Sequence, residues 1–124
     1  MEEGRLLTHL HAVLGEVGFV HFCQALGGTR VYVPYKLRDE NEIVKAIGRE
    51  LADKLARAMA PCHIRVPLAR RERALHFYMQ GLSNAQIARK LGITETGVEK
   101  LLRREPDLPP KPGSGKSPVQ LSLL

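Results

Sequence analysis

A chain of 124 residues and 13.8 kDa can hold one ordinary hydrophobic core or two very small ones. No apolar run reaches the roughly 18 residues of a membrane-spanning helix, and no signal sequence opens the chain, so we expect a soluble cytoplasmic protein. Cys23 and Cys62 form no CxxC pair, which predicts reduced thiols. Together with His21 and His63 they match no familiar zinc spacing, and we expect no metal and no cofactor.

The net charge of +6 is concentrated in one part of the chain. Residues 65–104 carry nine Lys and Arg against three Glu, whereas the charges before and after this segment cancel. A basic surface is often simply solvated, but a surface this one-sided favours a polyanionic partner.

The first third of the chain predicts a helix followed by a short strand. Apolar residues at intervals of three and four make residues 5–26 an amphipathic helix; they are Leu6, Leu10, Val13, Val17 and Val20. Residues 29–33 alternate polar and apolar and are rich in β-branched side chains, which is typical of a strand. Pro34 ends it, because proline cannot donate the next ladder hydrogen bond.

The same pattern then occurs a second time. Residues 39–58 predict another amphipathic helix, with Arg49 and Asp53 spaced to pair on its exposed side. The segment C-H-I-R-V-P at 62–67 follows, and it matches T-R-V-Y-V-P at an offset of 33 residues. The two strands can pair within one chain or each with its counterpart in a second subunit. We favour intersubunit pairing, because residues 1–60 are few for burying two apolar stripes.

A helix-turn-helix is predicted after a helix at 68–80, on whose outer side we expect Arg70, Arg71 and Arg73. Ser83 and Gln86 form a capping box at the start of a helix over residues 84–91. Gly92 supplies the left-handed turn that ends it, and Thr94 caps a second helix running to about residue 104. Small Ala88 permits the close crossing of the two helices.

The fold class predicted is therefore mainly α with short β-strands. A helical dimerisation domain with intersubunit strands occupies residues 1–66, and the helix-turn-helix domain occupies residues 67–105. A disordered tail rich in proline, glycine and serine occupies residues 106–124.

The helix-turn-helix predicts double-stranded DNA as the partner, with the second helix in the major groove. If Val98, Leu101 and Leu102 face inward, five residues face base edges: Glu95, Thr96, Glu99, Lys100 and Arg103. The predicted phosphate contacts are Arg70, Arg71, Ser83, Asn84, Arg89 and Lys90.

Residues 26–37, L-G-G-T-R-V-Y-V-P-Y-K-L, resemble the G-G-x-x-[aliphatic]-Y-[aliphatic]-P segment of the Mor transcription activator family. This resemblance implies a homodimer that activates phage or prophage genes with the host RNA polymerase. It places Gly27, Gly28, Tyr32 and Pro34 in the dimerisation strand and its approach to the linker. The helix-turn-helix itself looks more like LuxR-type or sigma region-four segments.

The function expected is that of a sequence-specific transcription regulator in a bacterial host cell, and not of an enzyme. Two alternatives stay open. One is a DNA-recognition subunit of a phage enzyme, such as a small terminase or a recombinase accessory protein. The other is a module that binds RNA polymerase or a sigma factor without contacting DNA.

Overall fold

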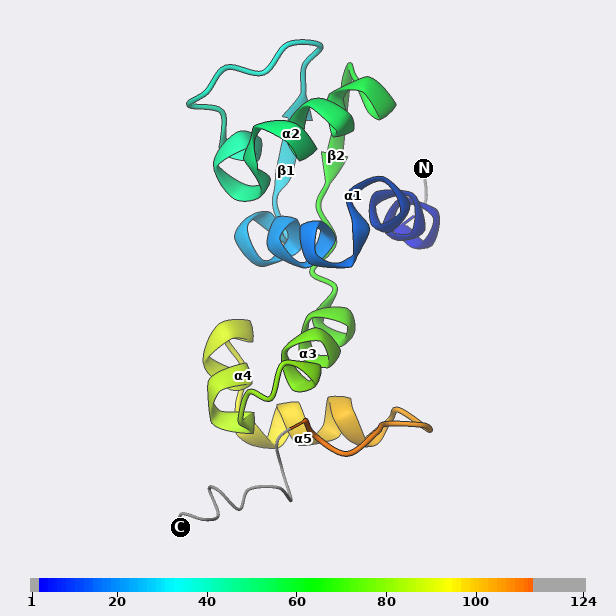
Figure 1. The fold of residues 1–124 in the computed structure, drawn as a ribbon, viewed down its shortest axis with the longest axis vertical. Helices are drawn as coiled ribbons and strands as arrows, with labels where there is room; N and C mark the ends of the chain where they lie inside the picture. The colour runs from blue at the N-terminus through cyan, green and yellow to red at the C-terminus, as the bar shows by residue number, and fades with distance from the viewer. Residues whose placement is uncertain (1–2, 113–124) are drawn as a thin grey trace. The chain divides into compact units, whose positions relative to one another are not determined.

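A computed structural model describes residues 3–112 and shows a mainly helical protein with one small two-stranded sheet, which confirms the predicted fold class (Figure 1). Its elements are α1 (Glu3–Leu26), β1 (Arg30–Val33), α2 (Glu42–Met59), β2 (Cys62–Arg65), α3 (Arg70–Met79), α4 (Asn84–Leu91) and α5 (Glu95–Arg103). They form two compact units that meet between Ala69 and Arg70.

Helix α1 is two helices joined at Gly15, whose φ of 75° and ψ of 171° are not helical. This backbone region is nearly closed to residues with a Cβ atom. The break shifts the apolar face along the second half, so Val17 of the predicted stripe is 55% exposed while Phe19 and Phe22 are fully buried. The expectation of one continuous stripe is therefore wrong at Val17, whereas Val20 is buried as expected.

By length and composition alone, Gly4–Leu26 could cross a membrane, although no spanning helix was expected. The break at Gly15 interrupts it, and its buried side chains pack in the core of the first unit.

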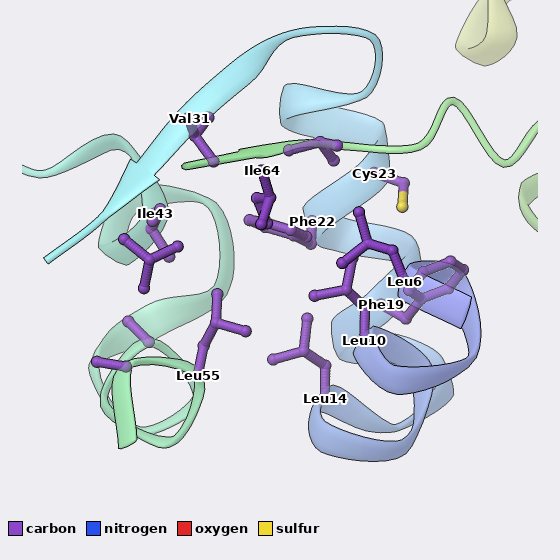
Figure 2. Close-up of a cluster of buried hydrophobic side chains, with 14 of the residues drawn as sticks. Leu6, Leu10, Leu14, Phe19, Phe22, Cys23, Val31, Ile43, Leu55 and Ile64 are labelled. Atoms are coloured by element: carbon purple, nitrogen blue, oxygen red, sulfur yellow. The ribbon is translucent and has the colours of Figure 1, made fainter. Parts of the chain in front are cut away.

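That core lies between α1, α2 and one face of the sheet (Figure 2). Leu10, Phe19 and Phe22 of α1 meet Ile43 and Leu55 of α2, and all five side chains are fully buried. The sheet contributes Val31 and Ile64 from its inner face. Removing such side chains from water is the main stabilisation available to a unit of this size.

β1 and β2 pair with each other, antiparallel, within the one chain. The prediction of intersubunit pairing for these strands is therefore wrong, and the intrachain alternative is the one that the structure shows. Val31 and Val33 face the core, whereas Arg30 and Tyr32 face away from it.

The repeat noticed in the two strands extends through both helices. Gly48 lies 33 positions after Gly15 and adopts the same unusual conformation, with φ 85° and ψ 165°. Val31 pairs with Ile64, its own counterpart at that offset, so an approximate two-fold axis passes through this pair. The equivalent core positions are buried in both copies: Leu10 and Ile43, Phe19 and Ala52, Phe22 and Leu55, Cys23 and Ala56, Val33 and Val66.

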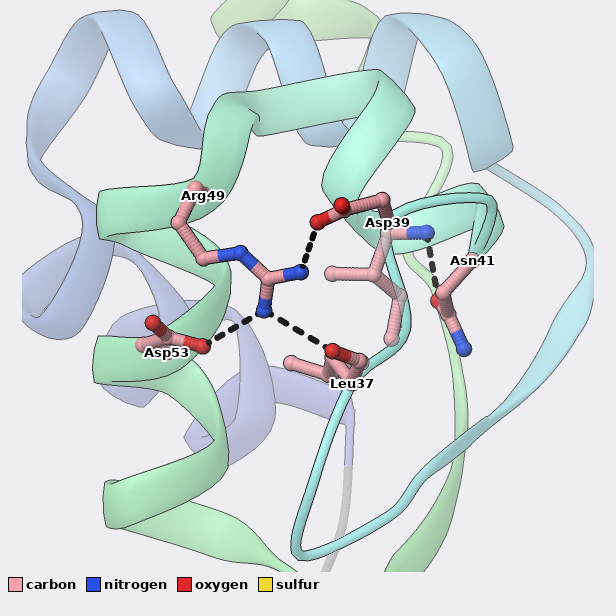
Figure 3. Close-up of polar contacts among 6 residues, drawn as sticks. Leu37, Asp39, Asn41, Arg49 and Asp53 are labelled. Carbon is pink, nitrogen blue, oxygen red and sulfur yellow. Dashed lines mark hydrogen bonds and ion pairs between the residues drawn. The ribbon is translucent and has the colours of Figure 1, made fainter.

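The loop between β1 and α2 is held by Arg49 (Figure 3). Its guanidinium donates hydrogen bonds to the Leu37 carbonyl oxygen at 2.9 Å and to the Asp53 carboxylate at 3.0 Å, and it also binds Asp39. The predicted Arg49–Asp53 pair is thus confirmed. Asn41 caps α2 by accepting a hydrogen bond from the Ile43 N–H.

The second unit is a three-helix bundle followed by an extended segment. Beyond α5, the chain returns to α3, where the Tyr78 hydroxyl donates to the Pro109 carbonyl at 2.6 Å and the Lys111 ammonium lies over the Tyr78 ring. The prediction of disorder from residue 106 is therefore wrong up to residue 112. Residues 113–124 of the predicted tail lie outside the described residues.

Candidate nucleic-acid interface

The start and end of α4 are fixed by the signals expected from the sequence. The Ser83 hydroxyl accepts a hydrogen bond from the Gln86 N–H, and the Gln86 side chain accepts one from the Ser83 N–H, so the capping box is confirmed. Gly92 ends the helix with φ 73° and ψ 33°, the left-handed conformation that glycine adopts without steric cost.

Helix α5 begins at Thr94, whose hydroxyl accepts a hydrogen bond from the Gly97 N–H at 2.9 Å. Its inner face consists of Val98 and Leu102, which are buried in the bundle with Ile87 and Ala88 of α4. The small side chain at Ala88 is consistent with the close crossing expected there. The two helices and the turn between them thus have the arrangement of a helix-turn-helix.

The opposite face of α5 is open to solvent along its whole length. All five residues predicted to face base edges lie on it and are exposed: Glu95, Thr96, Glu99, Lys100 and Arg103. Nine residues at about 1.5 Å each give a helix of roughly 14 Å, long enough to follow a major groove across several base pairs. Their proposed contacts with bases remain predictions.

This face is held by few internal contacts. Arg103 approaches Glu99 at 3.9 Å, and both side chains are more than half exposed. An exposed pair of this kind contributes little to stability, so either side chain can leave it for a ligand at small cost.

Most of the predicted phosphate contacts lie on the surface of the same unit. Arg70, Ser83, Arg89 and Lys90 are exposed, and Asn84 is half-buried at the start of α4. The Ser83 hydroxyl oxygen is used by the cap, but its hydrogen can still be donated to a phosphate. The Lys90 ammonium lies 5.3 Å from the centre of the Phe77 ring, which holds this side chain near the α3–α4 junction.

Arg71 has a different setting from the other cations. Its guanidinium donates two hydrogen bonds to the Glu105 carboxylate, at 2.6 and 2.9 Å, and approaches Glu72 at 3.4 Å. The bond to Glu105 raises the pKa of Arg71 above its ordinary value. The pair joins the first turn of α3 to the residue that follows α5, so Arg71 serves the bundle as a tie between its ends.

Arg73 is not on the outer side of α3, as predicted, but is 5% exposed in the bundle. Its guanidinium donates a hydrogen bond to the Lys90 carbonyl at 3.3 Å, in the last turn of α4. A cation is favourable there, because the final carbonyl groups of a helix carry partial negative charge and lack partners within it. Sequence spacing could have placed Arg73 on the same face as the buried Phe77, four residues later.

The residues predicted for the dimerisation strand lie in the first unit. A Cβ atom on Gly27 would lie 2.4 Å from the Cys23 carbonyl oxygen and 3.0 Å from the Pro67 carbonyl oxygen, so no larger residue fits. Gly28 donates a hydrogen bond to Val66, and Pro34 follows β1. Tyr32 is exposed, and the centre of its ring lies 4.8 Å from that of the His63 ring, with the two rings tilted by 44°.

Among residues 3–112, no three or more potential metal ligands lie together. The second unit offers an exposed face of α5, and Arg70, Arg89 and Lys90 are exposed on the same unit.

Comparison with known proteins agrees with this geometry. The family model described as Sigma-70, region 4 matches residues 68–105, which span α3, α4 and α5. No curated protein and no solved structure matches the chain. The likeness to sigma region four seen in the sequence is therefore confirmed, and residues 68–105 form a Sigma-70 region 4 domain, a DNA-binding helix-turn-helix.

Proposed function

We propose that the protein is a sequence-specific regulator of transcription that binds double-stranded DNA through α5. The observation that carries this proposal is the open face of α5, where five polar and charged side chains are exposed while Val98 and Leu102 hold the helix to the bundle. The match of the same residues to Sigma-70 region 4 supports it.

The proposed division of labour follows from side-chain chemistry. Lys100 and Arg103 donate to guanine O6 and N7, Glu95 and Glu99 accept from cytosine N4, and the Thr96 methyl group contacts thymine. Phosphate contacts come from Arg70, Ser83, Asn84, Arg89 and Lys90, which orient the helix without reading sequence. Of the arginines predicted to contact phosphate, Arg71 is the least available to a phosphate group, because its guanidinium already binds Glu105.

Site selection from a random pool of duplexes, followed by titration of variants, tests the proposal. Lys100→Ala and Arg103→Ala should each weaken binding to the selected duplex by about 1–3 kcal/mol while changing binding to a scrambled duplex far less. Arg57→Ala is the matched control, because Arg57 is an exposed cation at the end of α2 in the other unit. Equal losses on both duplexes, or failure to select any site, would contradict the proposal.

We propose further that the protein is a homodimeric activator of phage or prophage genes, acting in the cytoplasm with the host RNA polymerase. The resemblance of residues 26–37 to the Mor segment supports this role, and Sigma-70 region 4 domains bind RNA polymerase as well as DNA. A mass measurement in solution and transcription in vitro from the selected site test it. A monomer, or a selected site from which the protein lowers transcription, would contradict the dimeric activator.

The second candidate is a polymerase- or sigma-binding module that does not contact DNA. The polymerase contact of this candidate is supported by the family match, because Sigma-70 region 4 domains bind RNA polymerase as well as DNA. It predicts polymerase binding without any salt-dependent affinity for DNA, whereas a DNA-binding regulator loses affinity steeply as salt rises.

A further inference from the structure

The first unit contains a groove of about 860 Å³ along β2, on the side away from β1. Its walls are Leu6 and His9 of α1 and Ala58 and Met59 at the end of α2. The third side is β2 together with the two residues that follow it, Val66 and Pro67. In Figure 1, the first half of α1 and the end of α2 lie across from β1 on the other side of β2.

The backbone of β2 presents unused hydrogen-bonding groups to this groove. Val66 both donates to Thr29 and accepts from Gly28, so its N–H and C=O point toward β1. In an antiparallel pair this direction alternates along the strand, and His63 and Arg65 therefore direct their N–H and C=O groups to the free edge. A sheet edge of this kind is a template for another extended segment.

The side chains around the edge define which segment fits. Ile64 and Val66 face the core beside Leu6 and Met59, so one face of an added strand would meet apolar groups. His63 and Arg65 are exposed on the other face, and Arg65 stands directly opposite Arg30 with no ion pair to either among the described residues. Like charges opposite each other on neighbouring strands are destabilising, and an opposite charge offsets this cost.

We propose that this groove binds an extended peptide segment of a partner protein, added as a third strand along β2. The segment alternates apolar side chains, which face Leu6 and Met59, with acidic side chains, which lie beside His63 and Arg65. Pro61 and Pro67 flank the edge, which limits the paired stretch to a few residues. Main-chain hydrogen bonds supply affinity in this mode of recognition, and the alternate side chains supply specificity.

The site shares no residue with α5, because every residue in it belongs to the first unit. It would give the DNA-binding chain a docking point for a second protein without occupying α5.

The test uses the full chain and three synthetic peptides of equal length: alternating Val and Glu, alternating Val and Lys, and Val and Glu grouped in two blocks. Binding is followed by the amide signals and hydrogen exchange of His63 and Arg65 in NMR spectra. The alternating Val–Glu peptide should slow exchange of these two amides and bind roughly tenfold or more tightly than either control peptide.

Two variants separate the charge contribution from a general change in fold. Arg65→Ala should remove most of the preference for the acidic over the basic peptide. Arg30→Ala, the matched control, removes an exposed arginine directly opposite on β1, which does not line the groove, and should change the preference less.

Three outcomes would overturn the proposal. The first is that the three peptides bind equally, or that no peptide affects the amide signals or exchange of His63 and Arg65. The second is strong protection of these amides in the free protein that does not vary with concentration, which would mean that the chain covers its own edge. The third is protection that grows with concentration, which would mean that a second copy occupies it.

Discussion

The tie between Arg71 and Glu105 allows a sharp test of how the second unit is stabilised, because its two ends are unequally buried. The Glu105 side chain is 12% exposed, whereas that of Arg71 is 57% exposed. Truncating Arg71 removes two hydrogen bonds from the Glu105 carboxylate. Because this carboxylate is largely buried, water can replace only part of them. Truncating Glu105 leaves a guanidinium that water solvates readily.

The expected costs follow from this asymmetry. A largely buried acceptor that loses its partner costs about 1–3 kcal/mol. Because water can enter where the exposed Arg71 side chain was, we expect the lower part of that range, about 1–2 kcal/mol, for Arg71→Ala. Glu105→Ala should cost about 0–1 kcal/mol, as for a surface pair. The double variant should then be less destabilised than the sum of the two single variants.

Urea unfolding followed by circular dichroism measures these differences, and hydrogen exchange of α3 and α5 amides assigns them to the second unit. The assignment is needed because two compact units need not unfold in one transition. If Glu105→Ala costs as much as Arg71→Ala, the reasoning from unequal burial is wrong. If Arg71→Ala leaves stability unchanged but lowers the salt dependence of DNA binding, Arg71 is a phosphate contact as the sequence predicted.

Two further predictions concern the first unit. Gly48→Ala should destabilise it by about 1–3 kcal/mol in thermal or urea unfolding through backbone strain, because the φ of Gly48 is positive and, apart from its chain neighbours and the nearby backbone of its own helix, no atom lies within 4 Å of the added Cβ. Gly15→Ala should behave alike, and unchanged stability would contradict the conformation described. Burial raises the pKa of the Cys62 thiol, so its alkylation should show a higher pH midpoint in the folded protein than in urea. Since the unfolded thiol loses its proton first, stability should fall as pH rises from the unfolded toward the folded pKa, and equal midpoints would contradict this.

The helix-turn-helix could be predicted from the sequence because its signals are local. A cap such as Ser83 with Gln86, or a left-handed turn at Gly92, is decided by residues within one turn of the chain. The inner face of α5 could be predicted for the same reason, because the spacing of apolar residues within one short helix decides it. Val98 and Leu102 are buried as expected, and the five residues expected to face outward are exposed.

Arg73 was misplaced because its burial depends on a partner in another helix. Charge and spacing within α3 favour solvent for an arginine, and the carbonyl group that accepts a hydrogen bond from Arg73 lies in another helix, at the end of α4. The break in α1 was missed for a related reason. A glycine inside an amphipathic pattern reads as a weak helix position, and nothing local says that its φ is positive.

Both glycine breaks could have been found from the repeat. Gly15 and Gly48 are separated by the same 33 positions that separate the two strands, and a conformation open to glycine alone is a natural feature for both copies to share. The repeat of a helix and a strand was recognised in the sequence, but its offset of 33 residues was not applied to the glycines inside the helices.

The repeat also explains why intersubunit pairing of the strands was predicted wrongly, although a second copy of the unit is indeed needed. A single helix–glycine–helix–strand copy has one edge strand and one apolar face, too little to be stable alone, so a second copy is required. The chain supplies that copy itself: Val31 meets Ile64 on the two-fold axis, where a homodimer would bring together the same residue from each subunit. The β1–β2 contact is thereby used up within one chain. A dimer of this protein must consequently form through another surface. If that surface is the free edge of β2, a second copy of the chain and the proposed acidic peptide would compete for the same edge.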